Sequence, residues 1–196
     1  MVHISQARRG DGDAVEALAA LALGDALNAG LGRSAFAAAI DKAGGQIPLP
    51  HGHGVVLIAT TPDAAGADPG PGQVAGMLYM CPPIRFIDEC ADEGGMVQRG
   101  LTRALAEIEL LAVAPHARMQ GIGGALLSEA ERMVRARGGR LLYVKVRDAD
   151  RPVLRWYRQR GYRPLAWGET VDVVVARRRV GFAAGADGFR VAIKAL

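Results

Sequence analysis

The order of apolar and polar residues along the chain predicts strands that alternate with helices. Short apolar runs bounded by Gly, Pro or polar residues are typical of strands, and apolar residues every three or four positions are typical of amphipathic helices. The predicted strands are residues 2–8, 54–60, 73–80, 107–113, 141–146, 162–167, 171–179 and 189–196. The predicted helices are residues 14–29, 34–43 and 96–105, one from Gly121 to Gly138, and one capped by Asp150 that ends at Gly161. This pattern predicts a mixed α/β fold with one sheet.

The remaining segments are predicted to be loops or give no clear pattern. Residues 46–54 and 61–72 are rich in Pro and Gly, which is typical of exposed loops. Residues 82–105 hold an acidic cluster of Asp88, Glu89, Asp92 and Glu93 before the predicted helix. At the end of the chain, the last two strands are predicted to form a hairpin through residues 185–188.

Length and composition favour one globular domain over residues 1–196, with half of the residues hydrophobic and 22% charged. No apolar run reaches the length of a membrane span, and the N-terminus lacks the pattern of a signal peptide. We therefore expect a cytoplasmic protein without a membrane partner. Cys81 and Cys90 are too few for a disulfide framework, so reduced thiols are expected.

The net charge of +4 does not by itself identify a partner. Basic residues are spread over many segments and aromatic residues make up only 5% of the chain, so a nucleic-acid groove is not expected. His51 and His53 share one loop but lack a third ligand at a suitable spacing, so no metal site is predicted.

Residues 113–127, Val-Ala-Pro-His-Ala-Arg-Met-Gln-Gly-Ile-Gly-Gly-Ala-Leu-Leu, combine a strand end, a turn and a glycine-rich helix start. Unpaired N–H groups and the positive end of the helix dipole make such a corner suitable for a phosphate. A Walker loop would require Gly-Lys-Ser/Thr, which is absent. A dinucleotide fingerprint would require Gly or Ala at Leu126, and only Asp148 favours it.

The run Val113-Ala114-Pro115, followed by Arg118-Met119-Gln120-Gly121-Ile122-Gly123, resembles motif A of the GNAT superfamily of N-acetyltransferases. That motif joins Val-x-Pro to Arg/Gln-x-x-Gly-x-Gly/Ala. Residues 150–162, with Trp156-Tyr157 and Gly161-Tyr162, resemble the next block of the family in order and spacing. The close match covers residues 107–162.

The resemblance implies a single mixed, mostly antiparallel sheet flanked by helices, with a splayed parallel strand pair that forms an acyl-CoA cleft. The implied cosubstrate is acetyl-CoA, whose pyrophosphate meets backbone N–H groups and whose pantetheine arm pairs with a strand edge. The implied binding residues are Leu111, Ala112, Val113, Arg118, Met119, Gln120, Gly121, Ile122, Gly123 and Gly124. Asp150 replaces the Asn that is usual in the family, and helix capping explains this residue better than a phosphate contact.

The same resemblance implies direct acetyl transfer to a primary amine of a small molecule or protein. Tyr157 matches the tyrosine proposed as the acid for the leaving thiolate, and Glu107 and Glu109 lie where some members keep a base. For either glutamate, a solvated strand carboxylate is the competing interpretation. An acidic run at the cleft would favour a cationic acceptor.

Three questions stay open at this point. The acceptor is not identified, and a homodimer through exposed strands or residues 82–105 is one option. A non-catalytic acyl-CoA-binding sensor or interaction module is the alternative function. A nucleotide-binding regulator is a further one.

Overall fold

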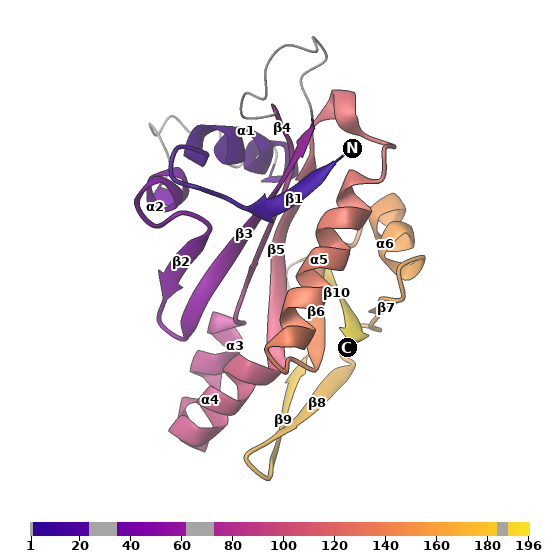
Figure 1. Cartoon of the computed structure of the whole chain (residues 1–196). Coiled ribbons are helices and arrows are strands. Elements are labelled where there is room, and N and C mark those ends of the chain that lie inside the picture. The colour runs from indigo at the N-terminus through magenta and orange to yellow at the C-terminus, as the bar shows by residue number, and fades with distance from the viewer. Residues whose placement is uncertain (1, 24–34, 62–72, 184–187) are drawn as a thin grey trace. The chain divides into compact units, whose positions relative to one another are not determined.

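The computed structural model describes residues 2–23, 35–61, 73–183 and 188–196, which Figure 1 shows as a coloured ribbon. The chain forms two compact units. Unit 1 contains Met1–Leu49, His53–Met80 and Leu110–Arg132, and unit 2 contains Pro50–Gly52, Cys81–Glu109 and Met133–Leu196. Each unit is described by itself below.

Antiparallel strands form the sheet of unit 1. Strand β3 (Gly52–Thr61) lies between β1 (His3–Gln6) and β4 (Gln73–Cys81), and β2 (Gln46–Leu49) also pairs with β3. The strand order continues from β4 to β5 (Leu105–Val113). The strands predicted over 2–8, 54–60 and 73–80 are thereby confirmed.

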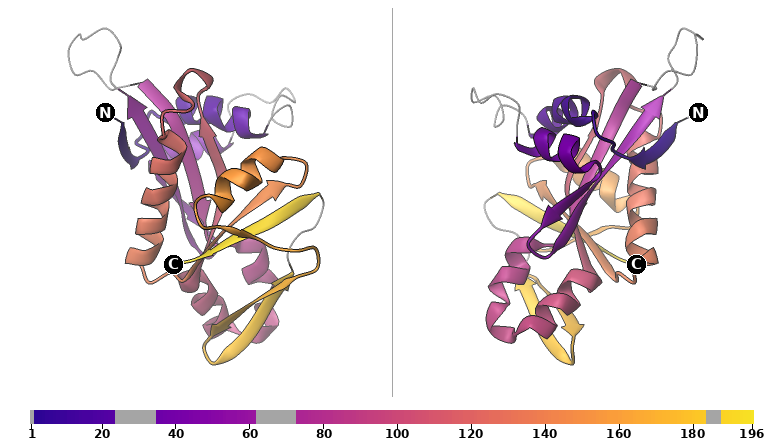
Figure 2. Two further views of the ribbon diagram at one scale, coloured as in Figure 1. Left: turned by 90° about the vertical axis from the view of Figure 1, so that its right-hand side faces the viewer. Right: turned by 60° about the vertical axis from the view of Figure 1, so that its left-hand side comes forward.

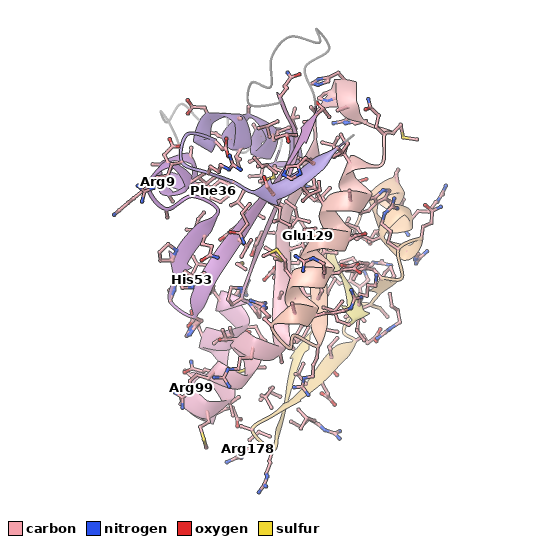
Figure 3. All side chains as sticks on the ribbon, viewed as in Figure 1. Arg9, Phe36, His53, Arg99, Glu129 and Arg178 are labelled. Carbon is pink, nitrogen blue, oxygen red and sulfur yellow. The ribbon has the colours of Figure 1, made fainter. Side chains whose placement is uncertain are left out.

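The helices of unit 1 are α1 (Gly12–Leu23), α2 (Ala35–Ala43) and the first part of α5 (Ile122–Ala136). Asp41 joins α2 to the start of α1, because its Oδ1 atom accepts the N–H groups of Gly10 and Gly12, each at 3.0 Å. Phe36, labelled in Figure 3, packs edge-on against Tyr79 with ring centroids 5.0 Å apart. The rest of the first predicted helix and the predicted loop over 62–72 lie outside the described residues.

The sheet of unit 2 contains the one parallel pair. The first half of β5 pairs in parallel with β6 (Leu141–Arg147), from Leu105↔Leu141 to Ile108↔Val144. Strand β10 (Phe189–Ala195) is antiparallel to both β6 and the short β7 (Arg163–Pro164). The predicted class, a mostly antiparallel sheet with a parallel pair and flanking helices, is confirmed.

Three helices and a hairpin complete unit 2. They are α3 (Ile84–Glu89), α4 (Gly95–Ala104), α6 (Arg151–Arg158) and the hairpin of β8 (Thr170–Val175) and β9 (Arg178–Ala183). Helix α4 and β8 contact each other, as both views in Figure 2 show. Their buried side chains share one core, which includes Phe86, Ile87, Leu101, Val173 and Val180. None of the described helices is both long and apolar enough to cross a membrane.

Two loop predictions and one strand prediction are wrong. Residues 46–54 contain β2 and the start of β3, because Ile47 is buried and Gly45 accepts the N–H of Val56 at 2.8 Å. Residues 171–179 form no single strand, since Ala176 and Arg177 take positive φ values of 48° and 61° and reverse the chain. The predicted final hairpin is also wrong, because β9 pairs with β8 and β10 joins the main sheet. The strand predicted over 162–167 is reduced to β7.

Gly76 allows the start of α5 to approach β4 closely. A Cβ atom at this position would lie 2.9 Å from Ile122 Cγ2 and 3.2 Å from the carbonyl oxygen of Ala112. We expect Gly76→Ala to lower the free energy of unfolding by about 1–3 kcal/mol, as overpacking does. Chemical denaturation measures this change. Gly95→Ala is the control, because its Cβ meets only the end of the flexible Arg99 side chain, and unchanged stability of Gly76→Ala would contradict the packing.

Candidate active site

The start of α5 in unit 1 presents free backbone donors at the end of β5. The chain leaves Val113 through a 3-10 turn (Pro115–Ala117), and then Met119 and Gly121 take positive φ values of 63° and 80°. The first helical hydrogen bond runs from the N–H of Ala125 to the carbonyl of Gly121, at 3.0 Å. The N–H groups of residues 122–124 therefore precede the first helical bond and are available to an anion.

The turn before α5 is held by its own side chains. Arg118 Nε donates to the carbonyl of Val113 at 3.3 Å, and Gln120 Nε2 donates to the carbonyl of His116 at 3.3 Å. Arg118, Met119 and Gly121 are exposed, while Ile122 is buried. The buried side chain anchors the helix, and the exposed residues leave the donors accessible. This arrangement fits the diphosphate of a nucleotide-like ligand.

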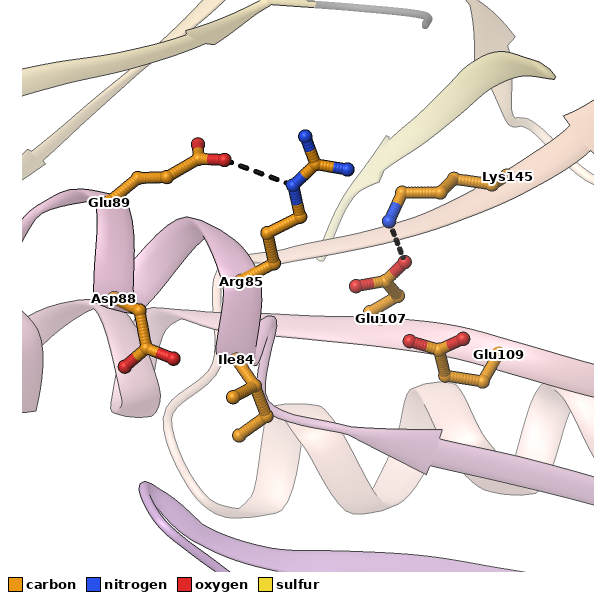
Figure 4. Close-up of a pocket in the computed structure, with 7 residues that line it drawn as sticks. All are labelled: Ile84, Arg85, Asp88, Glu89, Glu107, Glu109 and Lys145. Carbon is orange, nitrogen blue, oxygen red and sulfur yellow. Dashed lines mark hydrogen bonds and ion pairs between the residues drawn. The ribbon is translucent and has the colours of Figure 1, made fainter. Parts of the chain in front are cut away.

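A pocket of about 640 Å³ lies in unit 2. Figure 4 shows the side chains of Glu107 and Glu109 on β5 and Lys145 on β6 beside helix α3. Seven residues line it: Ile84, Arg85, Asp88, Glu89, Glu107, Glu109 and Lys145. The structure thus brings both predicted glutamates to one pocket wall.

Glu107 is the buried member of the pair. The Tyr143 hydroxyl donates to Glu107 Oε2 at 2.7 Å, and Lys145 Nζ forms an ion pair with Oε1 at 2.7 Å. Burial, followed by the charge of Glu107, raises the pKa of Tyr143, so its hydroxyl keeps the proton that it donates. Two partners therefore hold the Glu107 carboxylate in place, which suits a positioning role better than proton transfer.

Glu109 is exposed to the pocket and has a different environment. Partial removal of water raises the pKa of its carboxyl, and the neighbouring charge of Glu107 adds to this effect. Lys145 and the thiol of Cys81, whose Sγ lies 3.9 Å from Glu109 Oε1, act in the opposite direction. A carboxylate with a raised pKa is a stronger base, so Glu109 is the better candidate for removing a proton.

Tyr157 lies on α6 and is buried against other aromatic rings. Its ring centroid is 4.9 Å from that of Trp156 and 5.2 Å from that of Tyr162. Burial raises the pKa of Tyr157, with Arg160 opposing, so the phenol is protonated at neutral pH. It does not belong to the set that lines the described pocket. Asp150 caps α6 by accepting the N–H of Val153 at 3.5 Å, as predicted.

The sequence analysis missed the basic and tyrosine partners of the glutamates. Tyr143 and Lys145 are two positions apart on β6, and the two-residue period of a strand places them on the same face. Within the acidic cluster, only Asp88 and Glu89 line the pocket. His51 Nε2 contacts Asp88 Oδ1 at 2.6 Å, whereas His53, labelled in Figure 3, is exposed.

Comparison with known proteins identifies the class. Residues 68–162 match the model of the family described as Acetyltransferase (GNAT) family. No curated protein matches the sequence. Among similar solved structures, the IAA acetyltransferase of Bacillus cereus ATCC 14579 has 16% identity and a TM-score of 0.55, with all of both chains covered.

Two further structures carry ligands in their own sites. Arabidopsis thaliana NAA60, solved with a bisubstrate analogue, has 14% identity and a TM-score of 0.59 over 100% of this chain and 99% of its own. A GNAT family acetyltransferase from Elizabethkingia anophelis with acetyl-CoA bound has 15% identity and a TM-score of 0.56, over 100% and 98%. Such identities show a shared fold.

The chain therefore carries an acetyltransferase domain of the GNAT family in residues 68–162, as the two sequence motifs predicted.

Proposed function

We propose that the protein is an acetyl-CoA-dependent N-acetyltransferase that transfers the acetyl group directly to a primary amine. The observation that carries this proposal is the exposed start of α5, where Met119 and Gly121 turn the chain and three N–H groups precede the first helical bond. This cradle fits a pyrophosphate, because the space beside Gly121 is open. Acetyl-CoA, when bound, supplies the thioester.

The strand before the cradle has a backbone suited to the pantetheine arm. Pairing between β5 and β6 ends at Ile108↔Val144, although β5 continues to Val113. On its other side, the chain just after β5 is fixed to β4, since the N–H of Ala114 donates to the carbonyl of Ala75 at 2.8 Å. We propose that Leu111, Ala112 and Val113 pair with the arm as an added strand would. An N–H near Val113 then polarises the thioester carbonyl.

In the proposed reaction, Glu109 takes the proton from the acceptor ammonium. The amine lone pair then forms an N–C bond to the acetyl carbonyl carbon, and the C–S bond breaks. Tyr157 donates its phenolic proton to the departing thiolate. Along β5, Glu109 and Leu111 are about 7 Å apart and on the same strand face, which places the base close to the proposed arm site.

The proposal is tested by thiol release from acetyl-CoA with a panel of amines, together with thermal shift by CoA. We expect CoA to raise the melting temperature and at least one amine to stimulate thiol release. Absence of stabilisation by CoA would refute the cofactor site. Binding of CoA without transfer to any amine would favour the non-catalytic sensor instead.

Glu107→Gln is expected to move the pH profile while leaving most of the activity. The charge of Glu107 raises the pKa of Glu109, so its removal lowers that pKa. A base works only when deprotonated, and the acid limb of kcat/KM should therefore shift to lower pH. Rate measurements across pH in wild type and variant check the shift. An unshifted limb, or loss of activity at every pH in a folded variant, would make Glu107 itself the base candidate.

A further inference from the structure

The pocket wall in unit 2 has an excess of negative charge. It combines four carboxylates with two cations and one apolar side chain, namely Asp88, Glu89, Glu107, Glu109, Arg85, Lys145 and Ile84. A cavity lined in this way attracts positively charged ligands and repels anions.

The two cations are already paired with carboxylates. Lys145 Nζ lies 2.7 Å from Glu107, and Arg85 Nε donates to Glu89 Oε1 at 3.1 Å. In the described part of the chain, Glu109 and Asp88 form no ion pair with Lys or Arg. Their nearest polar partners are a thiol and an imidazole, respectively.

Glu107 gives a second sign that this wall is not internally satisfied. Its side chain is only 5% exposed, and its Oε1 atom accepts no hydrogen bond of good geometry from the described residues, although the Lys145 ammonium is near. Buried carboxylate oxygens usually accept hydrogen bonds. A ligand with N–H donors would supply what the wall lacks.

From these contacts we propose that the acceptor is a small amine that carries a second positive charge. The reacting amino group lies at Glu109, and the second ammonium lies at Asp88 and Glu89 on α3. In the view of Figure 4, Ile84 lies between Asp88 and Glu109, so it offers an apolar contact to the methylene chain that joins the two charges. This assignment rests on the proposed function and narrows its substrate class.

Three probes of similar length separate charge from size: 1,4-diaminobutane, n-pentylamine and 4-aminobutanoate. After correction for its two amino groups, the diamine should have a kcat/KM about tenfold above that of n-pentylamine, with 4-aminobutanoate lowest, because exposed charge pairs are modest in strength. High salt should reduce the preference, since it screens the pairs. Equal kcat/KM for the diamine and the monoamine would overturn the assignment.

Two double variants locate the effect. Asp88→Asn with Glu89→Gln should reduce the diamine preference to about twofold or less, because the weak attraction of exposed charges is removed. Asp92→Asn with Glu93→Gln is the matched control, since it makes the same change of charge in the same acidic cluster outside the pocket lining. An equal loss of preference in both double variants would contradict the assignment to this pocket.

Calorimetric binding of 1,4-diaminobutane separates this inference from the proposed function. If no amine is acetylated, the proposed function fails, and binding alone decides the inference. Binding that exceeds that of n-pentylamine, and that falls in the Asp88→Asn/Glu89→Gln variant, supports it. Absence of diamine binding to the folded wild-type protein overturns it.

Discussion

Replacing Glu109 with Gln is expected to lower kcat by about 100-fold or more at neutral pH, which is the usual contribution of a general base. The amide keeps the shape of the side chain but cannot take a proton from the acceptor ammonium. Glu109 is suited to this step because burial and Glu107 raise its pKa while it faces the pocket. Steady-state rates with saturating acetyl-CoA measure the loss.

The deficit of Glu109→Gln should shrink as the pH approaches the pKa of the free amine, about 10 for an alkylamine, because the acceptor then loses its proton without help. Glu93→Gln is the control, since Glu93 is exposed and outside the pocket lining. If Glu109→Gln retained its rate to within a few-fold of wild type at neutral pH, Glu109 would not be the base.

Gly123→Asp is expected to weaken CoA binding by about 100-fold or more while leaving the fold intact. A carboxylate in the first turn of α5 favours the helix, because it faces the positive end of the dipole. The same carboxylate competes for the free N–H groups and repels the diphosphate. Stability without ligand should therefore be maintained or raised as CoA affinity falls.

Calorimetric titration with CoA and thermal melting of the free protein measure the two effects of Gly123→Asp separately. Ser128→Asp is the control, because it adds the same charge to an exposed position farther along α5. Its CoA affinity should stay close to that of wild type. Unchanged affinity in Gly123→Asp would place the diphosphate elsewhere.

Much of the fold follows from local sequence signals. The buried face of α5 (Ile122, Leu126, Ala130 and Val134) and the cap at Asp150 are evident from residue spacing alone. The turn at Ala176 and Arg177 is not, because positive φ values usually require Gly or Asn and neither residue is present. Helix α3 was also missed, since its six residues are too few to show a period.

The candidate site was predictable where its residues share one segment. The motif from Val113 to Gly124 encodes its own turn and helix start, so the donors at α5 follow from the sequence. The partners of Glu107 depend on the pairing of β5 with β6, which joins positions 36 residues apart in the case of Tyr143. Such contacts arise from strand register, and no local pattern specifies them.

Direct transfer from acetyl-CoA to an amine is tested best by mass spectrometry with acetyl-CoA labelled with carbon-13 in the acetyl group. In the presence of 1,4-diaminobutane, we predict a labelled acetamide of the amine. When the amine is omitted, we predict no label on Cys81, whose thiol lies beside Glu109. Label that reaches Cys81 and then passes to the amine, or CoA binding without any labelled acetamide, would contradict direct transfer.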